Sequence, residues 1–382
     1  MKKGVIRFIA LVLAILMLVG IVSTIFTAHA ASMPDEVYGY GAGLNKKEVE
    51  DTAKLLGIRD LNITQVPIKG IDTSKYLGIQ STDDEMISSV YVKKNNNKNI
   101  TVEVTTPLSI QKVTSIQYSN AAITAGLENV DIKVAAITAV TGESALAGVY
   151  KVFEQSGIAI DRQKTKVANK EIEVVNKVSD EHKGKKGFSK DKLNKVVIDV
   201  KQKLLEEKKS GKDLSNEKIK NIVENSVKNG DLNQIINNVN IENLTLYFKD
   251  FINIDNLNIN VVQEQLNNLV KNIPNIANKE LDNAKKFLNT EEGKNFLNNV
   301  KDNLTKENLK KIADGVKNAL DSEQFENALN SVKDNLNTKK LTEMIDGVKK
   351  NISNDGVGFL SRVLNGIGNF FKSLVNSLKS LF

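Results

Sequence analysis

The sequence predicts an α+β N-terminal domain with the order β-α-β-β-β-α-β-α, followed by an all-α domain built as a helical repeat or bundle. Between residues 35 and 157, short apolar runs alternate with amphipathic segments bounded by Asn, Thr and Gly. After residue 160 the apolar residues recur at helical spacing, and Pro274 is the only proline beyond Pro107. The change of period places the division between the two parts near residue 160.

The first elements follow from local signals. The run VYGYG is extended, and Asn45 with Glu48 three residues later is typical of a capping box that starts a helix. Gly57 is the expected stop. The glycines of GYGAG are interpreted as a tight turn between strand and helix. Strand-like runs follow at 64–68, 87–93 and 100–105.

The later elements complete the order. The runs 87–93 and 100–105 flank the segment KNNNKN, which predicts a hairpin between them. A helix from 114 to 125, a strand from 130 to 137 and a helix from 142 to 155 follow. Thr141 or Ser144 is the expected cap of the last helix.

The expected division of the chain has five parts. They are a signal peptide (1–30), an α+β domain of unknown function (32–160), a charged linker (161–191), a helical domain (192–355) and an amphipathic C-terminal helix (356–382). Because the α+β part has enough apolar positions for one core, we expect it to fold alone.

The N-terminus predicts export. Lys2, Lys3 and Arg7 precede an apolar run from 8 to 26, and the small-residue site AHA ends at Ala30. This pattern predicts cleavage near Ala30 and an extracytoplasmic protein, secreted or attached to the cell surface. The alternative is an uncleaved anchor, since the apolar run is long enough to span a bilayer.

Composition restricts the chemistry. The chain has no cysteine, and its two histidines are His29, inside the signal peptide, and His182 in a charged stretch. Zinc sites built on His and Cys and triads that need a second histidine are therefore excluded. We expect His182 to be a solvated linker residue, and no catalytic residue, metal site or cofactor is predicted. Asp83, Asp84 and Glu85 are interpreted as a solvated loop, since no calcium-loop spacing surrounds them.

The net charge of +7 is unevenly placed: residues 158–382 are basic, which would favour anionic lipid or wall polymer surfaces. The stronger interpretation is that the Lys- and Asn-rich composition reflects coding bias alone. An exported chain without a basic cluster interleaved with aromatic residues is not expected to bind nucleic acid. The expected partners are an anionic membrane surface, a wall polymer or an envelope protein.

An internal repeat marks the helical part. Residues 296–320 match residues 328–352 with an offset of 32. Each unit reads as two short amphipathic helices that must stack on neighbours to bury their apolar faces. Two clear copies are few for a solenoid, so a compact or elongated bundle is expected.

The C-terminal stretch GVGFLSRVLNGIGNFFKSLVNSLKSLF carries basic but no acidic side chains. Arg362, Lys372 and Lys379 lie on its polar face. Its apolar face consists of Phe359, Leu360, Val363, Leu364, Ile367, Phe370, Phe371, Leu374, Leu378, Leu381 and Phe382. These residues predict a helix that contacts a membrane or a partner. The alternative is a terminal helix packed on the repeats.

Several segments together resemble one family. The runs VYGYGAGLNKKEVEDTAKLLGI, SSVYV and YSNAAITAGLENVDIKVAAITAVTGESALAGVYKVFE, behind an exported N-terminus, are similar to the YpuA-like proteins. The resemblance covers residues 35–160. It implies an exported protein of a Gram-positive bacterium with a domain of unknown function, and it supplies no catalytic residues.

We therefore expect a non-enzymatic, exported binding protein of the cell envelope. Two alternatives stay open: a wall-associated hydrolase that uses carboxylate chemistry, and a structural adaptor that binds another protein through its helices. A pocket with two facing carboxylates would favour the hydrolase.

Overall fold

The computed structural model describes residues 34–96, 99–303, 330, 333–334 and 336–350. The predicted signal peptide, most of the first repeat unit (304–320), parts of the second and the whole C-terminal helix lie outside these residues. The same holds for every membrane- or partner-contact residue predicted between Phe359 and Phe382.

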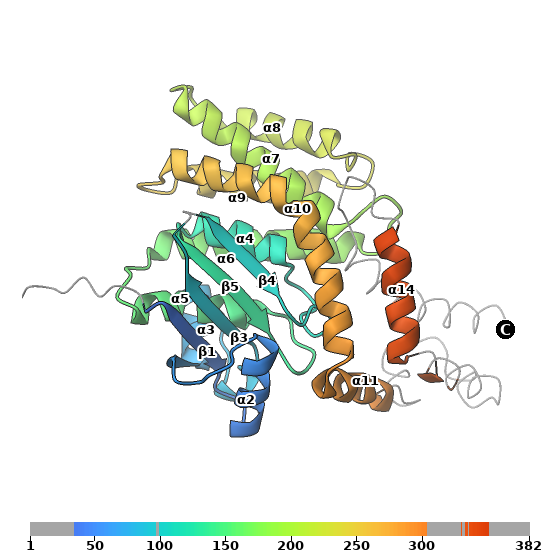
Figure 1. The fold of residues 1–382 in the computed structure, drawn as a ribbon. Helices are drawn as coiled ribbons and strands as arrows, with labels where there is room; N and C mark the ends of the chain where they lie inside the picture. The colour runs from blue at the N-terminus through green and yellow to red at the C-terminus, as the bar shows by residue number, and fades with distance from the viewer. Residues whose placement is uncertain (1–33, 97–98, 304–329, 331–332, 335, 351–382) are drawn as a thin grey trace, which may run out of the picture.

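A five-stranded mixed sheet forms the base of the fold, in the order β2-β1-β3-β5-β4 (Figure 1). Its strands are β1 (Glu36–Gly41), β2 (Thr64–Ile68), β3 (Ser89–Lys94), β4 (Ile100–Val104) and β5 (Val130–Ala135). The pairs β1–β2 and β4–β5 are parallel, and β3 lies antiparallel between them. Parallel neighbours need a crossover connection, and helices α2 (Lys46–Leu55) and α4 (Ser115–Thr124) provide it for β1–β2 and β4–β5.

The helices of this part are α2 (Lys46–Leu55), α3 (Gly70–Leu77), α4 (Ser115–Thr124) and α5 (Glu143–Gln155). The predicted capping box at the start of α2 is present, with the Glu48 N–H donating to Asn45 Oδ1 at 3.0 Å. The predicted side-chain cap of α5 is wrong, because Gly142, in a left-handed conformation, holds that position without a side-chain bond.

The observed order is β-α-β-α-β-β-α-β-α, which adds one helix to the predicted order, and the pairing of the strands also differs from the prediction. Helix α3 was missed because it has only eight residues and Lys69 gives its start no side-chain cap. The predicted β3–β4 hairpin is wrong. After β4 the chain continues through α4 into β5, and β5 lies between β3 and β4 and pairs with both.

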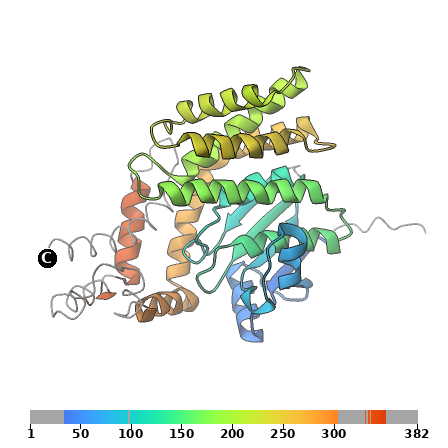
Figure 2. The ribbon, with the colours of Figure 1, turned by 180° about the vertical axis from the view of Figure 1, so that it is seen from behind.

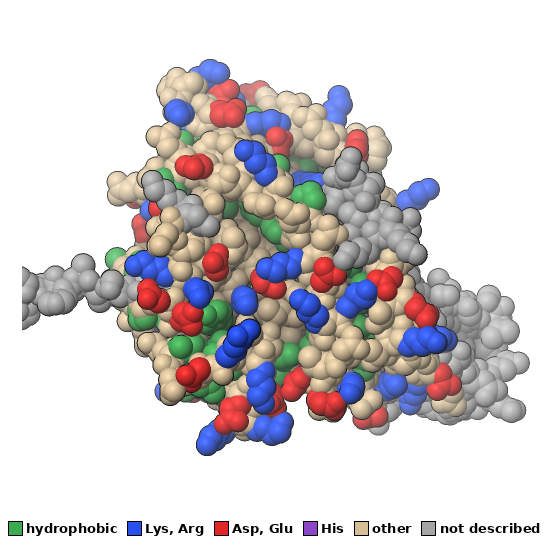
Figure 3. Space-filling view, in the orientation of Figure 1, with side chains coloured by type: hydrophobic (Ala, Val, Ile, Leu, Met, Phe, Trp, Pro, Cys, Tyr) green, Lys and Arg blue, Asp and Glu red, His purple; other side chains and the backbone are tan. Residues whose placement is uncertain are grey.

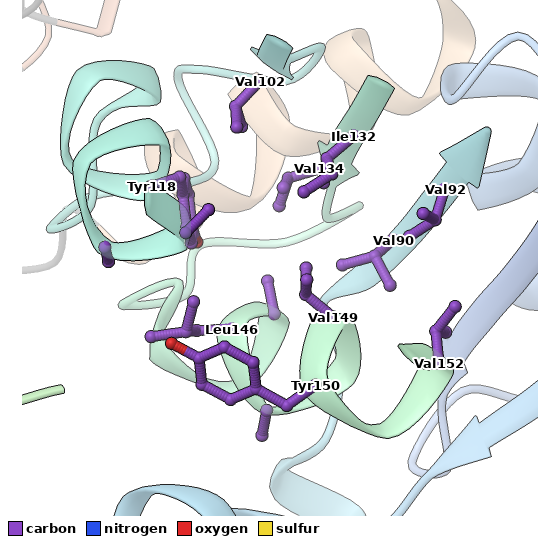
Figure 4. Close-up of a cluster of buried hydrophobic side chains, with 14 of the residues drawn as sticks. Val90, Val92, Val102, Tyr118, Ile132, Val134, Leu146, Val149, Tyr150 and Val152 are labelled. Carbon is purple, nitrogen blue, oxygen red and sulfur yellow. The ribbon is translucent and has the colours of Figure 1, made fainter. Parts of the chain in front are cut away.

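One face of the sheet carries the main core. Val90, Val92, Val102, Ile132 and Val134 point from the strands toward α5 and α4 (Figure 4). They meet a complementary set of side chains, Leu146, Val149, Tyr150, Val152 and Tyr118. The opposite face packs on α2 through a smaller cluster that includes Tyr38, Leu56 and Tyr91.

A layer of longer helices covers α4 on its far side (Figures 1 and 2). These helices are α6 (Arg162–His182), α7 (Lys190–Lys209), α8 (Asn216–Asn229), α9 (Asn238–Ile252) and α10 (Ile259–Leu288), with α11 (Glu291–Asn303) and α14 (Thr338–Lys350) beside the end of α10. α10 changes direction near its middle, where Pro274 removes one helical hydrogen bond. None of the helices in the described part combines the length and apolarity needed to cross a bilayer.

The segment expected as a charged linker, 161–191, consists mostly of α6. Val167, Ile172, Val175 and Val178 recur at helical spacing among its charges, and each is buried. Ile172 packs in the core of the sheet and the other three pack in the core of the helical layer. α6 therefore connects the two layers through packing and not as a spacer.

His182 is also not solvated, since only 3% of it is exposed. Its Nε2 lies 2.7 Å from Asn240 Oδ1, and the Lys185 ammonium lies 3.0 Å from its Nδ1. The ring packs against Phe188. The histidine fixes the end of α6 against α9, which is a structural role.

Candidate functional site

A groove of about 260 Å³ lies between three elements: the edge strand β4, the start of α4, and helix α10 of the helical layer. β4 supplies one wall and α10 the other: Asn268, before the bend of α10, bonds to Asn99 at the start of β4, and Asn283, after the bend, bonds to Val104 at its end. The groove residues come from two distant parts of the sequence, 99–119 and 265–283. Clefts of this kind, apolar with a few polar groups, are the usual place for ligands.

The backbone of β4 presents hydrogen-bonding groups to this groove. The N–H of Val130 donates to the carbonyl of Asn99, and the N–H of Thr105 donates to the carbonyl of Val134. In a parallel ladder, alternate residues face the partner strand. The backbone groups that face away from β5 are therefore those of Ile100, Val102 and Val104.

Within the part of the chain that the structure describes, the outward edge is closed at one end and open along the rest. The N–H of Val104 donates to Ser115 Oγ at 3.2 Å, and Asn283 Nδ2 donates to the Val104 carbonyl at 3.0 Å. Among the described residues, the outward N–H and carbonyl of Val102 have no protein partner, although only 6% of Val102 is exposed. Backbone groups at such a place require water or a ligand.

A second unpartnered group lies in the same groove. Gln265 of α10 is 4% exposed, and its Nε2 donates to the carbonyl of Leu127 at 3.1 Å. Its Oε1 accepts no hydrogen bond from the described residues. A buried amide oxygen without a donor is costly, so this atom favours a bound group that carries an N–H or O–H.

Two carboxyl groups line the groove in opposite electrostatic environments. Burial acts to raise the pKa of Glu103, but the Lys279 ammonium, 2.7 Å from Glu103 Oε2, and the Asn283 amide outweigh it and hold the pKa below its usual value. Burial raises the pKa of Glu280 to about 7, and the Asp191 carboxylate adds to the rise. Near neutral pH the first group is ionised and the second is partly protonated.

Glu280 is held at the start of α4. The Ser115 N–H, in the first turn of this helix, donates to Glu280 Oε1 at 3.0 Å. Thr114 caps the helix and exchanges hydrogen bonds with Gln117 in a capping box. The helix N-terminus favours a carboxylate, but it only partly offsets the loss of water around Glu280.

The variant Glu280→Gln is expected to change the pH dependence of stability. The folded chain keeps the proton of Glu280 between pH 4.5 and about 7, where an unfolded glutamate has lost it, so stability falls as pH rises through this window. The integrated difference is about 3 kcal/mol. Gln carries no such proton, so the variant should gain stability relative to the parent toward pH 8.

Urea unfolding of both proteins at pH 4.5, 6 and 8 measures this difference. Glu264→Gln, at an exposed position of the same helix, is the control and should follow the parent at each pH. Equal pH slopes for the parent and Glu280→Gln would contradict the assignment.

A second hollow, of about 190 Å³, lies on the other side of the start of α4. Burial lowers the pKa of Lys190 at its edge to about 8. This ammonium already donates to the carbonyl of Lys112 at 2.6 Å and to Asn176 Oδ1 at 2.9 Å. The Ser179 hydroxyl of this hollow has no partner among the described residues. The β4–α10 groove is nevertheless the stronger candidate, because it combines an unpartnered amide oxygen with an unpaired strand edge and two carboxyl groups.

The residues singled out in the sequence have structural roles elsewhere. GYGAG forms the predicted tight turn, where the Gly43 N–H donates to the carbonyl of Met86 at 3.0 Å. Asp83 accepts from the Gly70 N–H, and Glu85 accepts from the Thr82 N–H. No group of His, Cys, Asp and Glu within the described ranges has the arrangement of a metal site.

Fold and groove together define an α+β protein whose mixed sheet is covered by a helical layer, with a candidate binding site at the sheet edge. The chain belongs to the family described as Protein of unknown function (DUF1002), whose profile matches residues 40–269. The match continues past residue 160 through the helical layer, and it includes Val102 and Gln265 but not Glu280.

The chain is also similar to the uncharacterised protein YpuA of Bacillus subtilis (strain 168). The two are 27% identical over 158 residues, which cover 39% of this chain and 52% of YpuA. The chain thus matches about half the length of this curated relative. The resemblance to the YpuA-like proteins is confirmed, and no solved structure matches the chain.

Proposed function

We propose that this protein is a non-enzymatic, exported binding protein of the cell envelope that holds an extended, largely uncharged ligand in the β4–α10 groove. The observation that carries the proposal is the pair of unpartnered polar groups there: Gln265 Oε1 and the outward backbone of Val102. Both are buried, and a ligand with amide or hydroxyl groups would satisfy them.

The mixed charge of the surface supports a site that recognises its ligand by shape and hydrogen bonding and not by net charge. On the face seen in Figure 3, acidic and basic side chains are interspersed and no extended area has one sign. Export rests on the charged, apolar and AHA segments at the N-terminus. Contact with an anionic membrane through residues 356–382 is part of the same proposal.

Fractionation of the native host into medium, wall and membrane tests the proposal. We expect the protein in the wall or membrane fraction, with its N-terminus at Ala31. Asn272→Trp, which fills the groove from an exposed position of α10, should move most of the protein into the medium. Val270→Trp, on the same helix but outside the groove, is the control.

Truncation after Asp355 separates the two modes of attachment. Retention of the truncated protein in the wall fraction would assign attachment to the groove, and its loss from the membrane fraction would assign the membrane contact to residues 356–382. A protein with an intact Met1 in the cytoplasm, or equal distributions of both Trp variants and the parent, would contradict the proposal.

The second candidate function is a wall-associated hydrolase. The opposite pKa shifts of Glu103 and Glu280 in one groove favour it, since a glycosidase pairs an ionised carboxylate with a protonated carboxylic acid. Release of soluble saccharides from purified host walls, lost in both Glu103→Gln and Glu280→Gln, would establish this function in place of simple binding.

A further inference from the structure

We infer that the occupant of the groove is an extended, neutral to basic peptide segment of another envelope protein, which pairs with β4 as a sixth strand. This inference rests on the proposed function, and it names the class of ligand and the geometry of its binding.

The free strand edge supplies the pairing groups. Ile100 and Val102 both direct their backbone away from β5, and residues two apart in a strand are separated by about 6.6 Å. An extended peptide repeats its N–H and carbonyl pairs on one edge with the same spacing, so it can bond to both residues in register. An added strand of this kind gains affinity from main-chain hydrogen bonds.

The closed end of the edge defines where the peptide stops. The Ser115 hydroxyl and the Asn283 amide already bond to the backbone of Val104. A peptide strand can therefore pair with Ile100 and Val102 but not with Val104. The chain's own side chains imitate a neighbouring strand at that position, as expected where pairing ends.

The opposite wall fits the outer edge and the side chains of a peptide. Gln265 Oε1 can accept an N–H from the peptide backbone or from a side-chain amide. Leu269 and Ile276 of α10 provide apolar contacts between the polar positions of this wall. Asn272 and Asn275 of the same wall offer side-chain amides to polar groups of the peptide.

Charge selects among peptides. The ionisable side chains that line the groove are Glu103, Glu280 and Lys279, and Lys279 is paired with Glu103. The charge that remains unpaired in the groove is therefore that of the ionised form of Glu280. This negative charge disfavours acidic residues in the peptide and favours a basic residue at that end. A lysine in the peptide could donate to Glu280 in place of water.

The test uses heptapeptides selected from a random phage-displayed library on the full-length chain, then synthesised with capped ends and measured by calorimetry. N-methylation removes one backbone N–H at a time. Loss of affinity of about tenfold or more should recur at every second residue, namely those that face β4, with little effect at the residues between. Replacing the peptide's acidic residues by lysine should strengthen binding.

Two protein variants complete the test. Val102→Pro removes the outward N–H without touching the β4–β5 ladder, because the N–H of Val102 faces away from β5. It should weaken peptide binding about tenfold, measured well below the melting temperature of the variant, which should fall because the Val102 side chain packs in the core of the sheet. Val102→Ala, which also loses core contacts but keeps the N–H, is the control and should bind the peptide like the parent. Asn272→Trp should abolish binding, and Val270→Trp should leave it unchanged.

The inference is overturned if no selected peptide depends on the groove, if sensitivity to N-methylation does not alternate, or if soluble wall glycan displaces the peptides and binds more tightly. Peptide binding with the expected alternation, in a protein that fractionates away from the envelope, would uphold the sixth strand and refute the proposed location. Envelope attachment without peptide binding would uphold the proposed location and refute the sixth strand.

Discussion

Replacing Lys201 by Met is expected to lower the free energy of unfolding by about 3–5 kcal/mol, since it leaves a buried carboxylate without its partner. The Lys201 side chain is fully buried and lies 2.6 Å from Glu171 Oε2. Its ammonium also donates to Thr124 Oγ1 and Asn120 Oδ1. The hydroxyl of Tyr247 donates to the same Glu171 oxygen at 2.6 Å.

The network joins α4, α6, α7 and α9 at the centre of the layered structure, so its loss affects the whole fold. Burial lowers the pKa of Lys201, and the Glu171 carboxylate opposes that shift. The pair thus stabilises the fold only while both members are present, because each charge alone would be costly in the interior.

Urea unfolding at neutral pH measures the effect. The double variant Lys201→Met with Glu171→Gln should recover at least half of the lost stability, because no unpaired charge remains. Lys170→Met is the matched control: Lys170 pairs with Asp250, both are partly exposed, and the loss should stay below about 1 kcal/mol. A loss below 1 kcal/mol for Lys201→Met would refute the role of the network.

A fragment of residues 32–160 is expected not to unfold cooperatively, contrary to the expectation from its sequence. Every residue of α4 is buried, between the sheet on one side and the helical layer on the other. Ile116 and Ile123 of α4 pack in the helical core, and Ala168 and Ile172 of α6 complete the core of the sheet. The fragment would expose these apolar surfaces to water.

We would test the cooperativity of unfolding by calorimetry and near-ultraviolet circular dichroism of the fragment. A chain of residues 32–290 is the control. The longer chain keeps α6 to α10 and should show one sharp transition, whereas the fragment should show none or aggregate. A cooperative transition of the fragment close to that of the longer chain would mean that the sheet and its helices fold independently of the outer layer.

Local features of the fold could be predicted because neighbouring residues determine them. Asn45 and Glu48 form the capping box that the sequence predicts, and Gly57 has the left-handed conformation (φ +79°) of the predicted helix stop. The strand predicted at 64–68 has these bounds in the structure. Each of these signals depends on a few residues that are adjacent in the chain.

The pairing of strands depended on distant parts of the chain. The segment KNNNKN suits a turn between β3 and β4. The strand that pairs with β4 is nevertheless β5, because α4 packs on the sheet and leads the chain back beside β4. In the same way, the charges of 161–191 obscured the buried apolar face of α6, because the face becomes evident only when both layers are in place. These differences arise from packing, which a local pattern does not contain.

The candidate site was decided by the tertiary structure alone. Gln265 and Glu280 lie in an Asn- and Lys-rich helix, where the sequence gives no sign that they differ from surface residues. They became a buried unpartnered acceptor and a carboxyl with a raised pKa because α10 bends past β4 and the start of α4. The sequence determined the helix that carries them, and the fold determined their burial, because the loss of surrounding water depends on residues distant in the chain.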